Sequence, residues 1–217
     1  DMQKLFEPDY GLNLNRLEIP VNPYETFKCD VPNLSTSLYF VVNDQFYSKA
    51  LPKAKLNDGV IVDSLNRVAT ERPELVAKYY GRLANTEADA ITALNTMLAQ
   101  DGLFIYVPKN VQLERTIQVI NILRSDVDLM VNRRVLIVLE EGAKAQFLFC
   151  DHAADDRNFL ATQVIEAYVG ANANLELNCL EETHAKNVRV SNVYIEQQRD
   201  SRASHNVITL HNGVTRN

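Results

Sequence analysis

The feature that most constrains the fold of this chain is a repeat in its second half. The range Leu136–Asp151 aligns with Val164–Cys179 at a shift of 28 residues. At this shift Gly142 falls on Gly170, and the apolar positions that follow also coincide. A looser third copy begins at Ser201. Repetition at such a period predicts a stacked solenoid, in which each unit covers the apolar face of its neighbour.

Within each copy the pattern is typical of strands. In Asn174–Cys179 polar and apolar residues alternate, so one face of the strand is apolar. In the third copy Ala203 lies 30 residues after Ala173. Alternation does not fix strand direction, so an antiparallel sandwich is the competing architecture. The repeat favours a β-helix, a fold that more often presents a surface to partners than a reactive pocket.

Composition and charge exclude several classes of protein. Hydrophobic residues make up 46% of the 217 residues and charged residues 23%, which are ordinary globular values. The net charge of −6 argues against nucleic acid as a partner. The longest apolar runs have five residues, so no membrane partner or signal peptide is expected. Three widely spaced cysteines, Cys29, Cys150 and Cys179, suit a reducing cytoplasm.

We expect two parts, an N-terminal α/β segment over 1–101 and a β-helix core over 102–217. The N-terminal part should hold short strands at Leu38–Val42 and Val60–Val62. The chain starts without Met, stops after a strand-like run and shows no solenoid cap. We therefore expect a fragment whose core is incomplete at its C-terminal end.

About two helices are expected over residues 63–101. The first has Pro73 in its opening turn, and the second has Thr86 as its N-cap. Gly102 is expected to end the second helix as a left-handed C-cap. Strands then follow at Leu103–Val107, Ile117–Leu123, Arg134–Leu139, Gln146–Cys150, Gln163–Val169, Asn174–Leu180, Val188–Ile195 and Asn206–His211.

Motifs for nucleotide or metal chemistry are missing from the sequence. No two of the seven glycines lie within five residues of each other, so a P-loop and a dinucleotide fingerprint are absent. The sequence also lacks a G-x-S-x-G elbow, an H-E-x-x-H pair and a Cys-x-x-Cys pair. We therefore expect no catalytic residue and no ATPase activity in this chain.

Cys150 and His152 are the metal-ligand candidates. At a spacing of two on a strand both side chains leave the same face, where thiolate and imidazole could bind a soft metal. The alternative is that Cys150 packs as a small apolar residue and His152 begins a turn. Cys179 shares a face with Leu175 and Leu177, which predicts a core position. On the repeat the two thiols should point to opposite faces.

The remaining candidates are weaker. His205 and His211 would lie about 20 Å apart on one strand, too far to share a metal. His184 is expected in a solvated turn. The pair Glu140 and Glu141 precedes the glycine of the repeat, so a solvated turn is favoured over paired catalytic carboxylates.

Three blocks resemble the SufB/SufD family. The run Leu94–Lys109 resembles the family's junction between helix and β-helix, Gly59–Leu65 another family block, and Arg134–Ala143 its repeat signature. The run Asn121–Asn132 and the stretch that begins at Asp9 are more similar to SufD than to SufB. The likeness covers nearly the whole chain.

The resemblance implies a right-handed parallel β-helix in a non-catalytic scaffold for iron–sulfur cluster assembly. It implies SufB and a SufC ATPase as partners, with SufC carried by regions beyond this fragment. It implies a cluster held transiently by the full complex and no cofactor bound by this chain itself. The family's Cys-Ser-His-Gly stretch is absent before Asn217, so no cluster ligand can be transferred.

Two other functions stay open. A β-helix enzyme acting on polysaccharide would need clustered carboxylates and aromatic platforms, and the chain has no Trp. A plain protein-binding solenoid would have no link to iron. Because exposed sheet edges pair readily, we also expect the isolated chain to self-associate, with a homodimer as one form.

Overall fold

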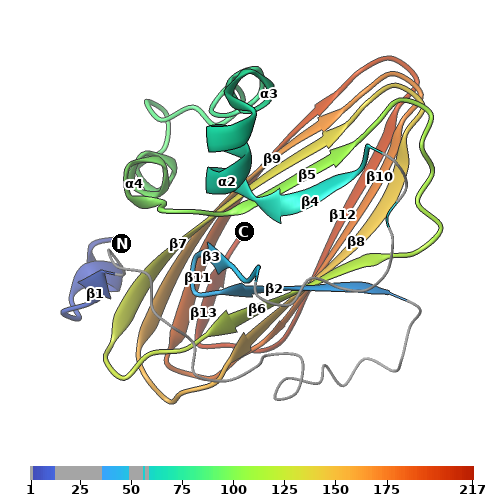
Figure 1. Ribbon diagram of the computed structural model, residues 1–217. Helices are drawn as coiled ribbons and strands as arrows, with labels where there is room; N and C mark the ends of the chain where they lie inside the picture. The colour runs from blue at the N-terminus through green and yellow to red at the C-terminus, as the bar shows by residue number, and fades with distance from the viewer. Residues whose placement is uncertain (1, 13–35, 49–55, 57–58) are drawn as a thin grey trace.

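The computed structural model describes residues 2–12, 36–48, 56 and 59–217. Figure 1 shows two long layers of strands, with helices on the outer side of one layer. Strands that follow one another by a full coil pair in parallel, as β7 with β9 and β8 with β10. The predicted parallel β-helix, preceded by a short segment with helices, is therefore confirmed.

The first layer, sheet A, has seven strands. Their order is β13-β11-β9-β7-β5-β4, and β1 pairs with β7 beside this path. The strand β4 runs antiparallel to β5, whereas the strands from β5 to β13 run parallel. The strands of sheet A are β1 (Gly11–Leu12), β4 (Ile61–Ser64), β5 (Leu103–Val107), β7 (Leu129–Leu139), β9 (Phe159–Val169), β11 (Asn187–Gln197) and β13 (Val214–Arg216).

The second layer, sheet B, has six strands in the order β12-β10-β8-β6-β2-β3. A coil consists of one strand from each sheet, so the pairs β5 and β6, β7 and β8, β9 and β10, and β11 and β12 make four coils. The strands of sheet B are β2 (Ser37–Val42), β3 (Gln45–Phe46), β6 (Ile117–Leu123), β8 (Lys144–Ala153), β10 (Asn174–Glu182) and β12 (Arg202–His211).

The predicted shifts between the copies are wrong by two residues. Leu175 pairs with Ala145, a shift of 30 residues in place of 28. Between β10 and β12 the error is reversed, because Ala203 pairs with Leu175 at a shift of 28 in place of 30. Both errors are even numbers. They therefore leave every side chain on its predicted face of the sheet.

The cause of this error lies in the turns between the sheets. One turn position has a positive φ in successive coils, and it holds Gly142 (φ 69°), Asn172 (φ 58°) and Asp200 (φ 58°). Asn and Asp adopt this left-handed conformation more readily than other residues with a side chain. Aligning Gly142 with Gly170 therefore matched two glycines that occupy different places in their turns.

Alternating side chains fill the space between the sheets. In β10 buried and half-buried positions alternate, as the sequence predicts for a strand with one inward face. Aromatic and branched side chains from both sheets interdigitate there, which removes them from water and stabilises the coils against one another. The largest apolar cluster of this interior includes Ile105, Ile137, Phe147, Phe149, Ile165, Leu175 and Leu177.

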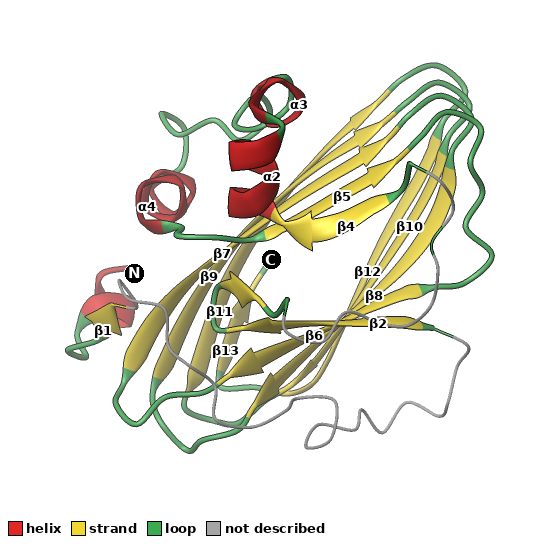
Figure 2. Cartoon of the chain, in the orientation of Figure 1, coloured by secondary structure: helices red, strands yellow, loops and turns green. Residues whose placement is uncertain are grey.

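A layer of helices covers the outer face of sheet A (Figure 2). It contains α2 (Leu65–Glu71), α3 (Pro73–Ala77) and α4 (Ala90–Leu98), and a short 3-10 helix, η1 (Met2–Phe6), lies near the N-terminus. Helix was expected over residues 63–101, but α2 was not predicted as a separate helix before Pro73. Its N-cap is Ser64, whose hydroxyl accepts a hydrogen bond from the Arg67 backbone N–H.

Two predicted helix boundaries are wrong. The N-cap of α4 is Asp89 and not Thr86, because the Asp89 carboxylate accepts the Thr92 backbone N–H. The helix ends at Leu98 and its C-cap is Ala99, with φ −62°, so Gly102 is not a left-handed cap. Gly102 is needed for another reason, since a Cβ there would lie 2.2 Å from the carbonyl oxygen of Arg134. A glycine lets the start of β5 approach β7 closely.

A buried ion pair anchors the helical layer to sheet A. The Glu166 carboxylate projects from β9 and accepts backbone N–H groups of Gly81, Leu83 and Ala84, at 2.9, 2.9 and 3.0 Å. Arg134 Nη2 on the neighbouring strand lies 2.5 Å from the same carboxylate, and neither side chain is exposed. The segment between α3 and α4 is thus held through its backbone as well as through the apolar packing of Tyr79 against Tyr168.

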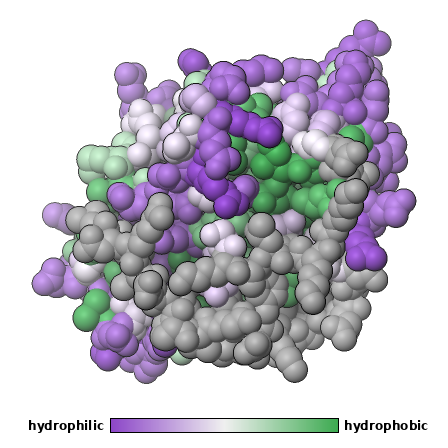
Figure 3. Space-filling model, viewed as in Figure 1, coloured by the Kyte–Doolittle hydropathy of each residue, from purple (hydrophilic) through white to green (hydrophobic). Residues whose placement is uncertain are grey.

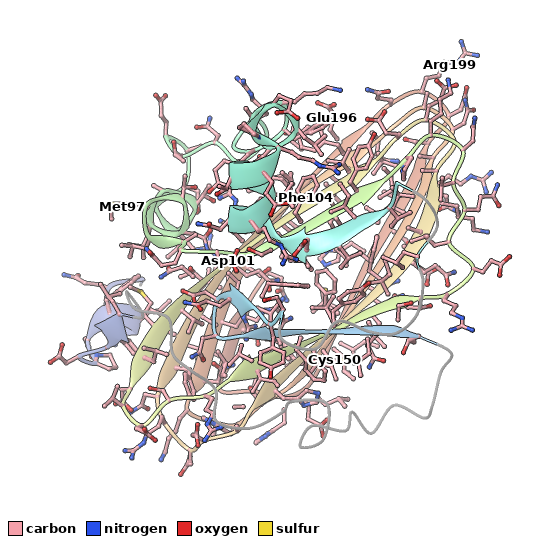
Figure 4. The ribbon with its side chains drawn as sticks, in the orientation of Figure 1. Met97, Asp101, Phe104, Cys150, Glu196 and Arg199 are labelled. Atoms are coloured by element: carbon pink, nitrogen blue, oxygen red, sulfur yellow. The ribbon has the colours of Figure 1, made fainter. Side chains whose placement is uncertain are left out.

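The outer surface is mixed in character. Figure 3 shows polar side chains around the rim of this face and an apolar area nearer its centre. Met97 projects from α4 away from the strands and is 71% exposed (Figure 4). In the described part of the chain, no helix has both the length and the apolar character needed to cross a membrane.

Candidate functional site

The predicted pair Cys150 and His152 lies on β8, on the outer face of sheet B. Cys150 is fully buried there and pairs across strands with Ile120, and Gln118 Nε2 lies 3.7 Å from its Sγ. His152 is half-buried, and its Nε2 is enclosed with no hydrogen-bond partner. The described ranges contain no group of three or more metal-ligating side chains. Metal binding by this pair therefore stays a prediction.

The two cysteines of the core face opposite ways, as predicted. Cys179 pairs with Phe149, which packs in the interior, whereas Cys150 is the next residue and points outward. Cys179 is 4% exposed. Burial raises the pKa of its thiol to about 12, against an opposing attraction from the Arg189 guanidinium. The thiol is therefore protonated at neutral pH.

A contact between Cys179 and His205 was not predicted from the sequence. The Sγ of Cys179 and the Nε2 of His205 lie 3.7 Å apart, on neighbouring strands and inside the coils. Burial, and then the charge of Arg189, lower the pKa of His205. The true register pairs His205 with Leu177, one inward position from Cys179. The predicted register placed His205 against Leu175, which is farther from the thiol.

His184 and His211 each lie within hydrogen-bond distance of a backbone carbonyl oxygen. His184 Nε2 lies 2.8 Å from the Asp155 carbonyl oxygen, and its ring packs 6.1 Å from that of Phe159. This side chain is half-buried rather than fully solvated. His211 Nδ1 lies 2.9 Å from the Thr183 carbonyl oxygen, on the exposed rim.

Glu140 and Glu141 do not form a carboxylate pair. Glu140 accepts hydrogen bonds from the hydroxyls of Tyr79 and Tyr106, at 3.1 and 3.4 Å. Glu141 instead binds Lys109 at 2.8 Å on the exposed surface. The two side chains therefore have separate partners, and neither is arranged for acid–base chemistry with the other.

A layer of charged side chains crosses the interior of the coils. Arg133 Nη1 lies 3.0 Å from an Asp151 oxygen, and Arg189 lies 3.4 Å from Asp151 and 3.0 Å from Glu181. All four side chains are at least 93% buried. Asn121 donates a further hydrogen bond of 2.7 Å to Asp151. Two positive and two negative charges thus compensate one another away from water.

The two arginines of this layer differ. Burial lowers the pKa of Arg133, with partial compensation from Asp151. Burial also opposes the charge of Arg189, but Asp151 and Glu181 together outweigh it and raise the pKa of that group. Arg189 contacts Asp151 on β8 and Glu181 on β10, so it binds carboxylates from two successive coils. Each of these residues lies at an inward position of its strand. The alternation of side chains along the strands could have predicted this from the sequence.

The last strands form an edge with exposed apolar side chains. In the described residues β12 pairs with β10 alone, and β13 with β11 alone. Ile208, Leu210 and Val214 on these strands are 55%, 63% and 50% exposed. We call β12 and β13 the edge surface, and it is the candidate site for an interaction.

An apolar column leads to this surface along the outer face of sheet B. It begins with the buried Phe40 on β2, continues through Ile120 and Cys150, and ends at Leu180 and Ile208. Exposure rises from 0% at Phe40 to 55% at Ile208. The edge surface thus continues a buried apolar layer into solvent.

Two family models together match all but one residue of the chain. Residues 1–119 match the family model of the SufBD protein N-terminal region, and residues 121–217 match that of the SufBD core domain of the SUF system for FeS cluster assembly.

Individual relatives agree with these models. A chloroplastic iron–sulfur cluster assembly SufBD family protein of Arabidopsis thaliana is 32% identical over 131 residues, which are 58% of this chain and 23% of the relative. A second Arabidopsis SufBD family protein is 28% identical over 78% of this chain and 35% of its own length. The iron–sulfur cluster assembly protein SufD of Bacillus subtilis is 33% identical over 55% of this chain and 27% of its own length. The chain thus spans about a quarter to a third of the curated relatives it matches.

Proposed function

This chain belongs to the SufB/SufD family of iron–sulfur cluster assembly proteins, and on that premise we propose that it is a scaffold subunit that pairs with SufB. A SufC ATPase would join the complex and supply nucleotide hydrolysis, since this sequence has no P-loop. The cluster is the cargo of the complex and would be held transiently by the assembly. We assign to none of the described residues a role in binding SufC or the cluster.

The observation that carries this proposal is the stack of four parallel coils, which makes a rigid platform. The strands of these coils are fixed by parallel neighbours, as β10 is by β8 and β12, so the outward faces of the sheets are presented rigidly. The exposed Ile208, Leu210 and Val214 add apolar area, which supplies affinity when it is covered. Among the described residues, the interior has charged pairs that compensate one another and no solvated acid–base pair. A platform for a partner fits these features better than an enzyme.

The location we propose is a reducing compartment such as the cytoplasm. The three cysteines are few and widely spaced, and Cys150 and Cys179 lie on opposite faces of one sheet. They do not form the dense framework of disulfides that stabilises small secreted domains.

Co-purification tests the proposal. We expect tagged chain, expressed together with SufB and SufC of the same organism, to retain SufB. Ile208→Asp should weaken the retention at least tenfold, because a carboxylate would be buried without a partner at the interface. Met97→Asp is the matched control, since Met97 is an exposed apolar residue on the helical layer. Recovery of neither SufB nor SufC would favour a binding module without a link to iron.

A further inference from the structure

The turn of the hairpin between β2 and β3 lies against the interior of the first coil. Its residues Asn43 and Asp44 are each 2% exposed, and Asn43 adopts a positive φ of 55°. The side-chain amide of Asn43 forms two hydrogen bonds of 2.9 Å with the backbone of Arg124. Its carbonyl oxygen accepts a hydrogen bond of 3.0 Å from Nε of Arg133 on β7. The hairpin therefore contacts the layer of charged side chains directly.

A small cavity lies beneath this turn. The space open to the centre of a water molecule is about 10 Å³, which is close to the room that one buried water needs. The described lining residues come from the hairpin and from the first two coils, so the cavity belongs to the N-terminal end of the stack. The lining includes the polar side chains of Asp44, Asn121 and Arg133 and the apolar side chains of Val41, Val135 and Phe149.

Arg133 brings hydrogen-bond donors to this cavity. Its Nε donates to the Asn43 carbonyl oxygen, and its Nη1 donates to Asp151 at 3.0 Å. Its Nη2 has no hydrogen-bond partner among the described residues, although the side chain is only 3% exposed. A buried donor without a partner destabilises the folded state, and a charged donor does so more than a neutral one. A ligand in the cavity would satisfy this nitrogen.

The surrounding charges select a neutral ligand. The charged side chains that act on the Arg133 guanidinium are Asp44, Asp151, Glu181 and Arg189. Three carboxylates therefore face two guanidinium groups, and an anion would add to the excess of negative charge. A metal cation needs lone pairs, which a guanidinium does not have. Water can accept a hydrogen bond from Nη2 and donate its own hydrogens to side-chain oxygens of the lining.

We propose that the cavity holds one buried water molecule, which bridges Nη2 of Arg133 to a side-chain oxygen of Asp44 or Asn121. The water joins the hairpin at the first coil to the charged layer inside the stack. Its role is independent of the proposed pairing with SufB, because it concerns the interior of this chain alone.

Magnetic relaxation dispersion of the solvent around the 217-residue chain tests this site, because its amplitude reports the number of long-lived buried waters. Val135→Ile adds a methyl group to the wall of the cavity and should displace the water, so the amplitude should fall by the equivalent of one molecule. Val119→Ile is the matched control, since Val119 is fully buried but is not among the described lining residues. It should leave the amplitude unchanged. An unchanged amplitude with Val135→Ile, or an equal fall in both variants, would overturn the proposal.

A crystal structure of the unsubstituted chain, at a resolution that shows ordered water, decides the matter even if a variant fails to fold. One peak of solvent density should lie within hydrogen-bond distance of Arg133 Nη2 and of an oxygen of Asp44 or Asn121. Featureless density at this place would refute the site, and so would a peak that refines as an ion.

Discussion

Removal of the Glu166 charge is the sharpest test of how the helical layer is held. Glu166→Gln keeps the size of the side chain but leaves the Arg134 guanidinium buried without its counter-charge. Arg134 also donates a hydrogen bond of 2.9 Å to Thr96 Oγ1 and stacks 4.6 Å from the Tyr80 ring, so it cannot turn outward without losing both contacts. Breaking one side of a buried ion pair costs about 3–5 kcal/mol.

The loss should be visible in equilibrium unfolding. A change of 1 kcal/mol shifts Tm by about 2–4 °C in a chain of this size. We therefore expect Glu166→Gln to lower Tm by about 6–20 °C and the urea midpoint in proportion. Hydrogen exchange should rise most in residues 65–98, because the carboxylate binds the backbone between α3 and α4.

Two further variants separate the ion pair from a general effect of the substitution. Glu141→Gln removes an exposed carboxylate that binds Lys109, and it should cost about 0–1 kcal/mol. The double variant Arg134→Met with Glu166→Leu removes both charges, and it should be more stable than the sum of the single changes predicts. If Glu166→Gln costs no more than Glu141→Gln, the ion pair does not anchor the layer.

Three other outcomes follow from the described contacts. Gly102→Ala should destabilise the chain by more than about 1 kcal/mol in urea unfolding, because its Cβ would lie 2.2 Å from the Arg134 carbonyl oxygen; an unchanged midpoint would refute the close approach. Stability should fall as pH rises from about 9 toward 12, since the Cys179 thiol, with a pKa raised to about 12, ionises only on unfolding. The thiol should contribute at most about 1.4 kcal/mol per pH unit to the slope, because Tyr168, with a pKa also raised to about 12, adds to it; a Cys179→Ser variant with the same slope as the unsubstituted chain would contradict this cause. Light scattering should give a mass above the 24.6 kDa monomer at high concentration, reduced by Ile208→Asp but not by Met97→Asp, and a strict monomer would count against self-association at the edge surface.

Strand periodicity was sufficient to place many of the core side chains correctly. Because side chains alternate along a strand, the sequence predicted that Cys150 and Cys179 face opposite ways, and an error of two residues in register did not alter this. The candidate site was predicted less well. The repeat predicted exposed sheet edges. The contact of Cys179 with His205 depends on the register between β10 and β12, which the repeat alignment placed two residues away from the observed one.

The sequence by itself determined the class of fold. Its repeat, its alternating strands and its scarcity of glycine are local properties, and local properties suffice to predict coils of strands without a nucleotide site. Tertiary structure decided the register, because the left-handed turn position is filled by Gly142, Asn172 and Asp200, which have no common residue type. It also decided the partners of Arg134 and Arg189. A buried charge is stable only beside its counter-charge, and here those carboxylates come from other coils of the helix.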